Sequence, residues 1–66
     1  MIDLGYMIRK RYDLGWTQKE TARRIGTAQA CLSQWESGKK QPSNIPKFLE
    51  WCKALGVDPR EAIKYD

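Results

Sequence analysis

The chain has 66 residues, which predicts one domain spanning residues 1–66 and leaves no room for a deep catalytic cleft between two lobes. Twelve Lys and Arg stand against eight Asp and Glu, so the formal net charge of +4 favours an anionic partner. Residues 9–40 hold eight Lys and Arg against three Asp and Glu, so we expect the positive field there.

The cysteines and the absence of histidine argue against metal and enzyme chemistry. Cys31 and Cys52 lack metal-ligand spacing and fall in apolar helical patterns, so we expect free thiols in a reducing cytoplasm. The sequence has no Gly-rich phosphate loop and no obvious pair of catalytic carboxylates, so we expect no enzyme activity, no cofactor and no small-molecule substrate. We also expect no signal peptide, because the N-terminus has no continuous apolar segment, and no membrane span, because no apolar run approaches about 18 residues.

The first two helices are marked by glycines and a cap. Helical spacing of apolar residues predicts the first helix from about Leu4 to Asp13, ended by Gly15. The second helix begins at Thr17, which forms a predicted capping box with Glu20, and it closes at Gly26.

Three further helices are expected. The third occupies about Ala28 to Ser37 and stops at Gly38, and the fourth lies within about Asn44 to Leu55. The fifth runs from about Pro59 to Tyr65, after a second predicted capping box of Asp58 and Glu61. The sequence therefore predicts an all-α, compact five-helix domain.

The third helix has two different faces when its residues are placed at about 100° intervals. Cys31, Leu32 and Trp35 share an apolar face that must pack. The other face is uncharged and consists of Gln29, Ala30, Ser33, Gln34 and Ser37. Gln can pair with adenine, Ala can touch a thymine methyl and Ser can donate or accept, so this face suits the major groove of DNA.

Basic residues surround that face in the expected fold. They lie on the first two helices and in the loop after the third: Lys10, Lys19, Arg23, Lys39 and Lys40. Cations of this kind contact phosphates and set the register of a protein on DNA. The N-terminus of the second helix adds free backbone N–H groups, and Gln18 adds a side-chain amide, which also suit a phosphate.

Two runs carry a resemblance to a known family. They are Trp16 to Gly26 (WTQKETARRIG) and Gln29 to Lys39 (QACLSQWESGK), supported by Pro42-Ser43 and by Lys53 to Gly56. Over about residues 4 to 63 the chain resembles the Cro and lambda-repressor-like (Xre-type) family. It departs from the family at Ala28, where Ser or Thr usually caps the third helix, and at Thr21, where a core leucine is usual.

The resemblance implies a five-helix lambda-repressor-like domain whose helix-turn-helix, about residues 17–37, binds double-stranded DNA. By position it implies base contacts from the start and outer face of the third helix: Ala28, Gln29, Ala30, Ser33 and Gln34. It implies backbone contacts from Thr17, Gln18, Ser37, Lys39 and Lys40. It also implies an ion pair between Arg11 and Glu36.

We therefore expect a Cro-like repressor of a phage or bacterial operator. Two subunits would place their third helices in successive major grooves, about 34 Å apart on a pseudo-palindromic site. The homodimer surface is expected in the C-terminal third, near Val57, Pro59, Ile63 and Tyr65.

One alternative remains open from the sequence. A small domain of this kind could be a protein-interaction module or an antitoxin-type subunit, with secondary or lost operator binding. A membrane-surface role is disfavoured, because no helix pairs a Lys-rich face with a large apolar face.

Overall fold

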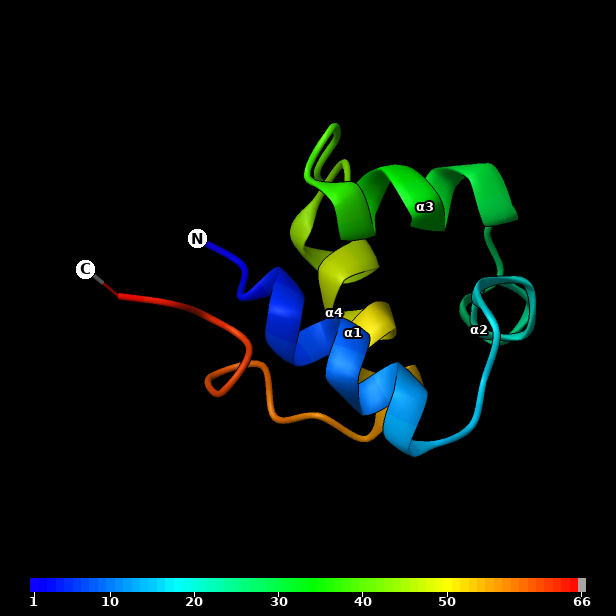
Figure 1. Cartoon of the computed structure of the whole chain (residues 1–66). Helices are drawn as coiled ribbons and strands as arrows, with labels where there is room; N and C mark the ends of the chain where they lie inside the picture. Colours follow the sequence, from blue (N-terminus) through cyan, green and yellow to red (C-terminus); the bar gives the residue numbers. More distant parts are fainter. Residues whose placement is uncertain (66) are drawn as a thin grey trace.

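A computed structural model describes residues 1–65 of the chain. Four helices lie within these residues: α1 (Leu4–Asp13), α2 (Gln18–Ile25), α3 (Gln29–Ser37) and α4 (Ile45–Leu55) (Figure 1). None of the helices in this part of the chain has the length and apolarity needed to cross a membrane. The expected all-helical architecture is confirmed, but the expected number of helices is not.

Three of the four helices begin with a side-chain cap. Asp3, Thr17 and Asn44 each accept a hydrogen bond from the backbone N–H three residues ahead, at 2.9 to 3.1 Å. Such a bond satisfies one of the N–H groups that a helix start leaves unpaired. Helix α3 is the exception, because Ala28 stands at its cap position and offers no side-chain acceptor.

Glycines end α2 and α3 in the left-handed conformation. Gly26 has φ of 88° and Gly38 has φ of 81°, values that other residues adopt only with strain. Gly26 allows the tight turn that carries the chain from α2 into α3. Gly38 stops α3 and directs the following loop, residues 39–44, toward the start of α4.

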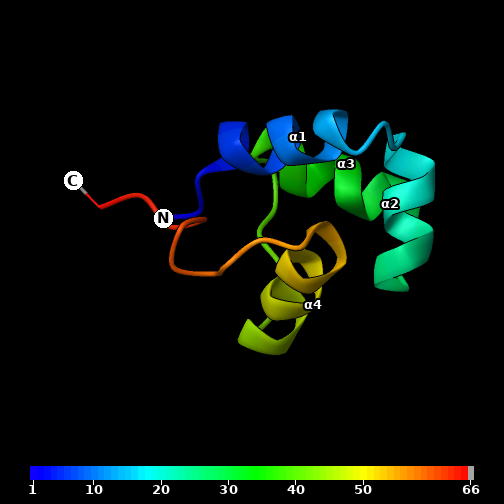
Figure 2. The same cartoon turned by 90° about the horizontal axis from the view of Figure 1, so that it is seen from below.

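The core lies among all four helices, and a tryptophan of α3 and a tryptophan of α4 meet within it. Trp51 is fully buried, and its ring centroid lies 5.3 Å from that of Trp35 at a tilted angle of 43°. Met7 of α1 and Leu32 of α3 complete the centre, and both are fully buried. Figures 1 and 2 show α2 at one end of the molecule and both chain termini at the other.

Thr21 occupies a core position without leaving a polar atom unpaired. It is fully buried, and its hydroxyl donates to the backbone carbonyl of Thr17 at 2.9 Å. The bond stays within α2, so the hydroxyl needs no partner on another helix.

The prediction of a fifth helix from Pro59 to Tyr65 is wrong. Residues 59–62 form turns, and Ile63 then makes an isolated antiparallel bridge with Ile2. The backbone N–H of Lys64 donates to the Met1 carbonyl, and that of Asp3 donates to the Ala62 carbonyl, each at 2.7 Å. In a helix, the N–H of Lys64 and the carbonyl of Ala62 would bond within residues 59–65. Here both groups bond to the N-terminal segment instead.

The second capping box also fails to form. The Asp58 carboxylate accepts from the backbone N–H of Arg60, two residues ahead, and so makes a turn rather than a helix cap. Glu61 accepts from the hydroxyl of Tyr6 instead of reaching back to Asp58, and this bond raises the pKa of Tyr6. The C-terminal segment is therefore held against α1.

The course of the C-terminal segment determines which of the expected dimer contacts are accessible. Val57 is 6% exposed and belongs to the core, so it is not available to a partner and the prediction for it is wrong. Pro59 and Ile63 are half-buried, whereas Tyr65 is 83% exposed.

Candidate nucleic-acid interface

The two faces of α3 are separated in the structure. Leu32 and Trp35 are buried against the core, at 0% and 4% exposure. The opposite face is open to solvent: Ala28, Gln29, Ala30 and Ser37 are exposed, and Ser33 and Gln34 are half-buried. Because the buried residues alternate with the open ones along one short helix, the packing that anchors α3 also sets the direction of its amide and hydroxyl groups.

The C-terminal end of α3 is tied to the loop that follows. The Gln34 carbonyl accepts from the Ser37 hydroxyl and from the backbone N–H of Lys40, both at 3.2 Å. Lys39 and Lys40 are exposed in this loop. The backbone of the loop that carries both lysines is thereby held at the C-terminal end of α3.

A buried polar network joins α3 to α1. Arg11 donates from Nε to Oε2 of Glu36 at 2.8 Å and from Nη2 to Oε1 at 3.1 Å, and the two residues are only 6% and 7% exposed. The remaining nitrogen, Nη1, donates to the Trp16 carbonyl at 2.9 Å. The hydrogen bonds and charge of Glu36 raise the pKa of Arg11. Arg11 therefore fixes α3 relative to the loop that precedes α2.

Gln18 belongs to the same network, which the sequence did not suggest. Its Nε2 donates to Oε1 of Glu36 at 3.0 Å. An amide nitrogen has two N–H donors, so one N–H is committed to Glu36 and the other remains. The network therefore orients the Gln18 side chain at the first turn of α2.

Thr17 is exposed at the N-terminus of α2, where its hydroxyl oxygen accepts from the Glu20 N–H at 3.1 Å. The first half of the predicted capping box is confirmed. The second half is wrong, because the Glu20 carboxylate turns away from Thr17 and binds two arginines.

Those arginines are Arg23 and Arg24. Arg23 donates to both carboxylate oxygens of Glu20, at 2.9 and 2.7 Å, and Arg24 donates to Oε1 at 3.1 Å. The hydrogen bond from Arg23 is the main reason that the pKa of Glu20 falls to about 2. The spacings of three and four residues are those at which opposite charges meet on a helix, so the pattern of the sequence could have revealed this cluster.

Two of the residues predicted to contact phosphate, Arg23 and Lys10, have side chains that already contact other residues of the chain. Arg23 is engaged by Glu20. Lys10 lies with its Nζ 5.4 Å from the centre of the Tyr6 ring, and Tyr6 is bonded to Glu61 of the C-terminal segment. Arg11, one position further along α1, instead points to Glu36 of α3.

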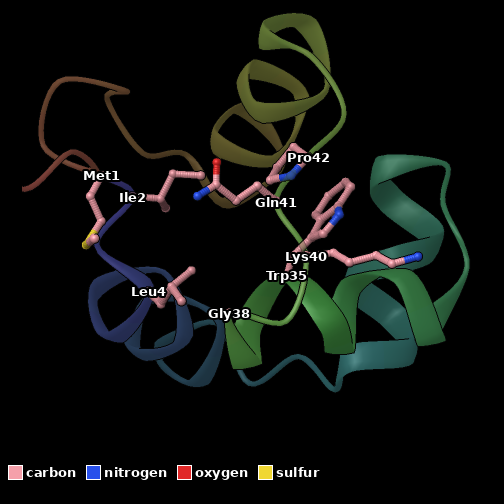
Figure 3. A pocket seen from close by; sticks show the side chains of 8 residues that line it. All are labelled: Met1, Ile2, Leu4, Trp35, Gly38, Lys40, Gln41 and Pro42. Carbon is pink, nitrogen blue, oxygen red and sulfur yellow. The ribbon is translucent and has the colours of Figure 1, made fainter.

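A pocket of about 200 Å³ lies beside the end of α3, between the N-terminal segment and the loop after Gly38 (Figure 3). Its walls are mostly apolar and comprise Met1, Ile2, Leu4, Trp35, Gly38, Lys40, Gln41 and Pro42. Figure 3 shows the Lys40 side chain extending away from Met1, Ile2 and Leu4. The pocket therefore brings together no acid, base and nucleophile of the kind that catalysis requires.

Comparison with models of known protein families identifies the domain. A family model described as helix-turn-helix matches residues 6–61, which covers most of the chain and includes all of α2 and α3. No solved structure matches the chain significantly.

Proposed function

Since the chain belongs to the Cro and lambda-repressor-like family of helix-turn-helix DNA-binding proteins, we propose that it represses transcription by reading an operator with α3. The observation that carries the proposal is the pair of faces on α3. The inner face is locked by Leu32 and Trp35, and the outer face presents only uncharged, short or amide-bearing side chains beside two lysines. A helix of this kind can approach base edges closely.

The proposal divides the surface into two groups. The base-reading residues are Ala28, Gln29, Ala30, Ser33 and Gln34. The phosphate-binding residues are Thr17, the free N–H of Gln18, Ser37, Lys39 and Lys40. Base contacts supply discrimination, whereas phosphate contacts supply affinity and register. Lys10 and Arg23 are left out of the second group, because their side chains are engaged with Tyr6 and Glu20.

We further propose that two copies bind together on a pseudo-palindromic site. The longest dimension of the described chain is 31 Å, and it carries a single α3 of nine residues. Successive major grooves on one face of DNA lie about 34 Å apart, so one copy has only one helix to place in them. Pro59, Ile63 and Tyr65 are the proposed contacts between the copies, because they lie in the C-terminal segment and remain at least partly accessible.

Selection from a pool of random duplexes tests the function. The protein is mixed with the pool, bound duplexes are recovered over several rounds, and their sequences are read. We expect enrichment of two inverted half-sites whose centres lie about one helical turn apart. A pool that stays random while the protein is folded would contradict operator reading.

A second candidate function has one observation in its favour. Ile45 and Leu49 lie one turn apart on the outer side of α4 and are 72% and 44% exposed, as expected of a surface that meets another protein. Titration against random duplex at two salt concentrations separates the two candidates, because DNA binding weakens steeply with salt. Binding to random duplex that is absent, or whose affinity does not change with salt, would favour the protein-binding role.

A further inference from the structure

One carboxylate on α2 is paired with an exposed arginine in the last turn of the same helix, Arg23, which the sequence placed among the expected phosphate contacts. Glu20 lies in the first turn of α2, three residues after the cap at Thr17. Both of its oxygens are occupied by Arg23, from Nη2 at 2.7 Å and from Nε at 2.9 Å. A fork of two parallel bonds of this type restricts the direction of a guanidinium more than a single contact does.

The two arginines bound by Glu20 have different surroundings. The guanidinium of Arg24 lies 4.2 Å from the centre of the Trp16 ring, and its side chain shares a surface hollow with Glu50 and Lys53 of α4. Arg23 has no further partner within the described residues, and its side chain is 69% exposed. Removing the Glu20 charge would therefore free Arg23, while Arg24 would keep its place on Trp16.

A freed arginine at this position would act on every duplex alike. Phosphate contacts raise affinity without reading sequence, and each one adds about 0.9 to the slope of log affinity against log salt. An additional contact of this kind raises binding to random DNA. The same contact forms at an operator, so it changes the overall affinity for DNA and leaves the discrimination between sequences unchanged.

We propose that Glu20 limits the sequence-independent DNA affinity of the protein by holding Arg23 away from the DNA backbone. The proposal rests on the proposed function, because it assigns a role at the same DNA-binding surface. An exposed ion pair is weak, so removing it changes the affinity for DNA only modestly. The effect on random DNA is accordingly small, about three- to fivefold, and it is resolved best through the salt slope.

The test uses the full chain and a mixed-sequence duplex of about two helical turns, titrated between about 50 and 200 mM salt. We expect Glu20→Gln to bind this duplex about three- to fivefold more tightly at the low salt and to steepen the slope by about one. Adding Arg23→Gln to this variant returns the slope to that of the unchanged chain. Adding Arg24→Gln instead leaves the steeper slope in place.

Two controls keep the result specific. Asp58→Asn removes the same amount of charge from a carboxylate that also holds an arginine, Arg60, in the turn after α4, and we expect its slope to be unchanged. Arg23→Gln alone should also leave the slope unchanged, because the arginine is already restrained. This single variant keeps the original Glu20 and tests the proposal even where Glu20→Gln folds poorly.

Three results would overturn the proposal. They are an unchanged slope for folded Glu20→Gln, equal steepening by Asp58→Asn, and a shallower slope for Arg23→Gln alone. Failure of the proposed function has a different signature, since the unchanged chain would then show no salt-dependent binding to any duplex.

Discussion

At the scale of single residues, Glu36 has more connections than its sequence position suggests. It is buried on α3, yet it accepts hydrogen bonds from Arg11 of α1 and from Gln18 of α2. A buried carboxylate is tolerated only when its charge and its oxygens are all paired, and here the pairing joins three helices. The network thereby couples the orientation of α3 to the end of α2 that we propose docks on a phosphate.

Glu36→Gln is expected to lower the free energy of unfolding by about 3 kcal/mol, because it leaves the Arg11 charge buried without a counter-charge. Urea unfolding followed by circular dichroism measures the change. Replacing both partners, as Arg11→Met with Glu36→Leu, should recover much of the loss. A single variant as stable as the unchanged chain would show that the pair contributes little.

At the scale of elements, α3 stands out as the helix whose N-terminus has no side-chain cap. The three capped helices begin with Asp3, Thr17 and Asn44, and α3 begins with Ala28. Its stability therefore depends on the packing of Leu32 and Trp35 and on the Glu36 network. This arrangement suits a helix whose first turn is proposed to lie against base pairs rather than against its own side chains.

Ala28→Ser should stabilise the fold by about 0.5–1 kcal/mol, because a hydroxyl at this position can accept a backbone N–H of the first turn. Thermal unfolding measures the gain, and Asn44→Ala, which removes the cap of α4, should give a loss of similar size. No gain for Ala28→Ser, together with a clear loss for Asn44→Ala, would contradict the view that α3 lacks a usable cap.

Gly38, at the end of α3, lies beside the side chain of Leu4 in α1, and this proximity gives a further prediction. An added Cβ at Gly38 would lie 3.3 Å from Cδ1 of Leu4, whereas one at Gly26 would meet no atom within 4 Å. Both glycines have positive φ, so each substitution by alanine costs about 1 kcal/mol of backbone strain. Gly38→Ala should therefore destabilise the fold more than Gly26→Ala in urea unfolding. Equal losses would mean that Leu4 moves aside freely.

At the scale of the whole molecule, the termini close the domain on the side opposite α2. The bridge between Ile2 and Ile63 and the bonds beside it hold the C-terminal segment against the start of α1 (Figure 1). The helix-turn-helix lies at the α2 end of the molecule, and the proposed contacts between copies lie at the other. Two copies joined through their C-terminal segments would hold their α2 helices apart, as a site with two half-sites requires.

Sequence reasoning was most successful where local chemistry decides structure. The bounds of α1 follow from the helical spacing of its apolar residues, and the cap of α2 by Thr17 and the stop of α3 at Gly38 follow from capping and left-handed glycine. It failed for residues 59–65, because the groups that bond Asp3 and Lys64 belong to segments about 60 residues apart in the chain. The position of Val57 was missed for the same reason, since its burial depends on how that segment returns to the core.

The candidate site shows the same division. Helical periodicity was sufficient to separate Leu32 and Trp35 from the outer face of α3. It could not show that Gln18 binds Glu36, because their side chains meet only after α2 and α3 pack. The ion pair between Glu20 and Arg23 is local, so their spacing in the sequence could have predicted it. The capping box, however, offered a competing partner for the same carboxylate.

The central claim is that the outer face of α3 reads base pairs. The most direct measurement compares the unchanged chain with Gln29→Ala on a selected operator, on operators with each base pair changed in turn, and on random duplex. We expect Gln29→Ala to lose about 1–3 kcal/mol of discrimination at one base pair of each half-site and to keep discrimination elsewhere. An equal loss of affinity on every duplex, including the random one, would contradict base reading by this face.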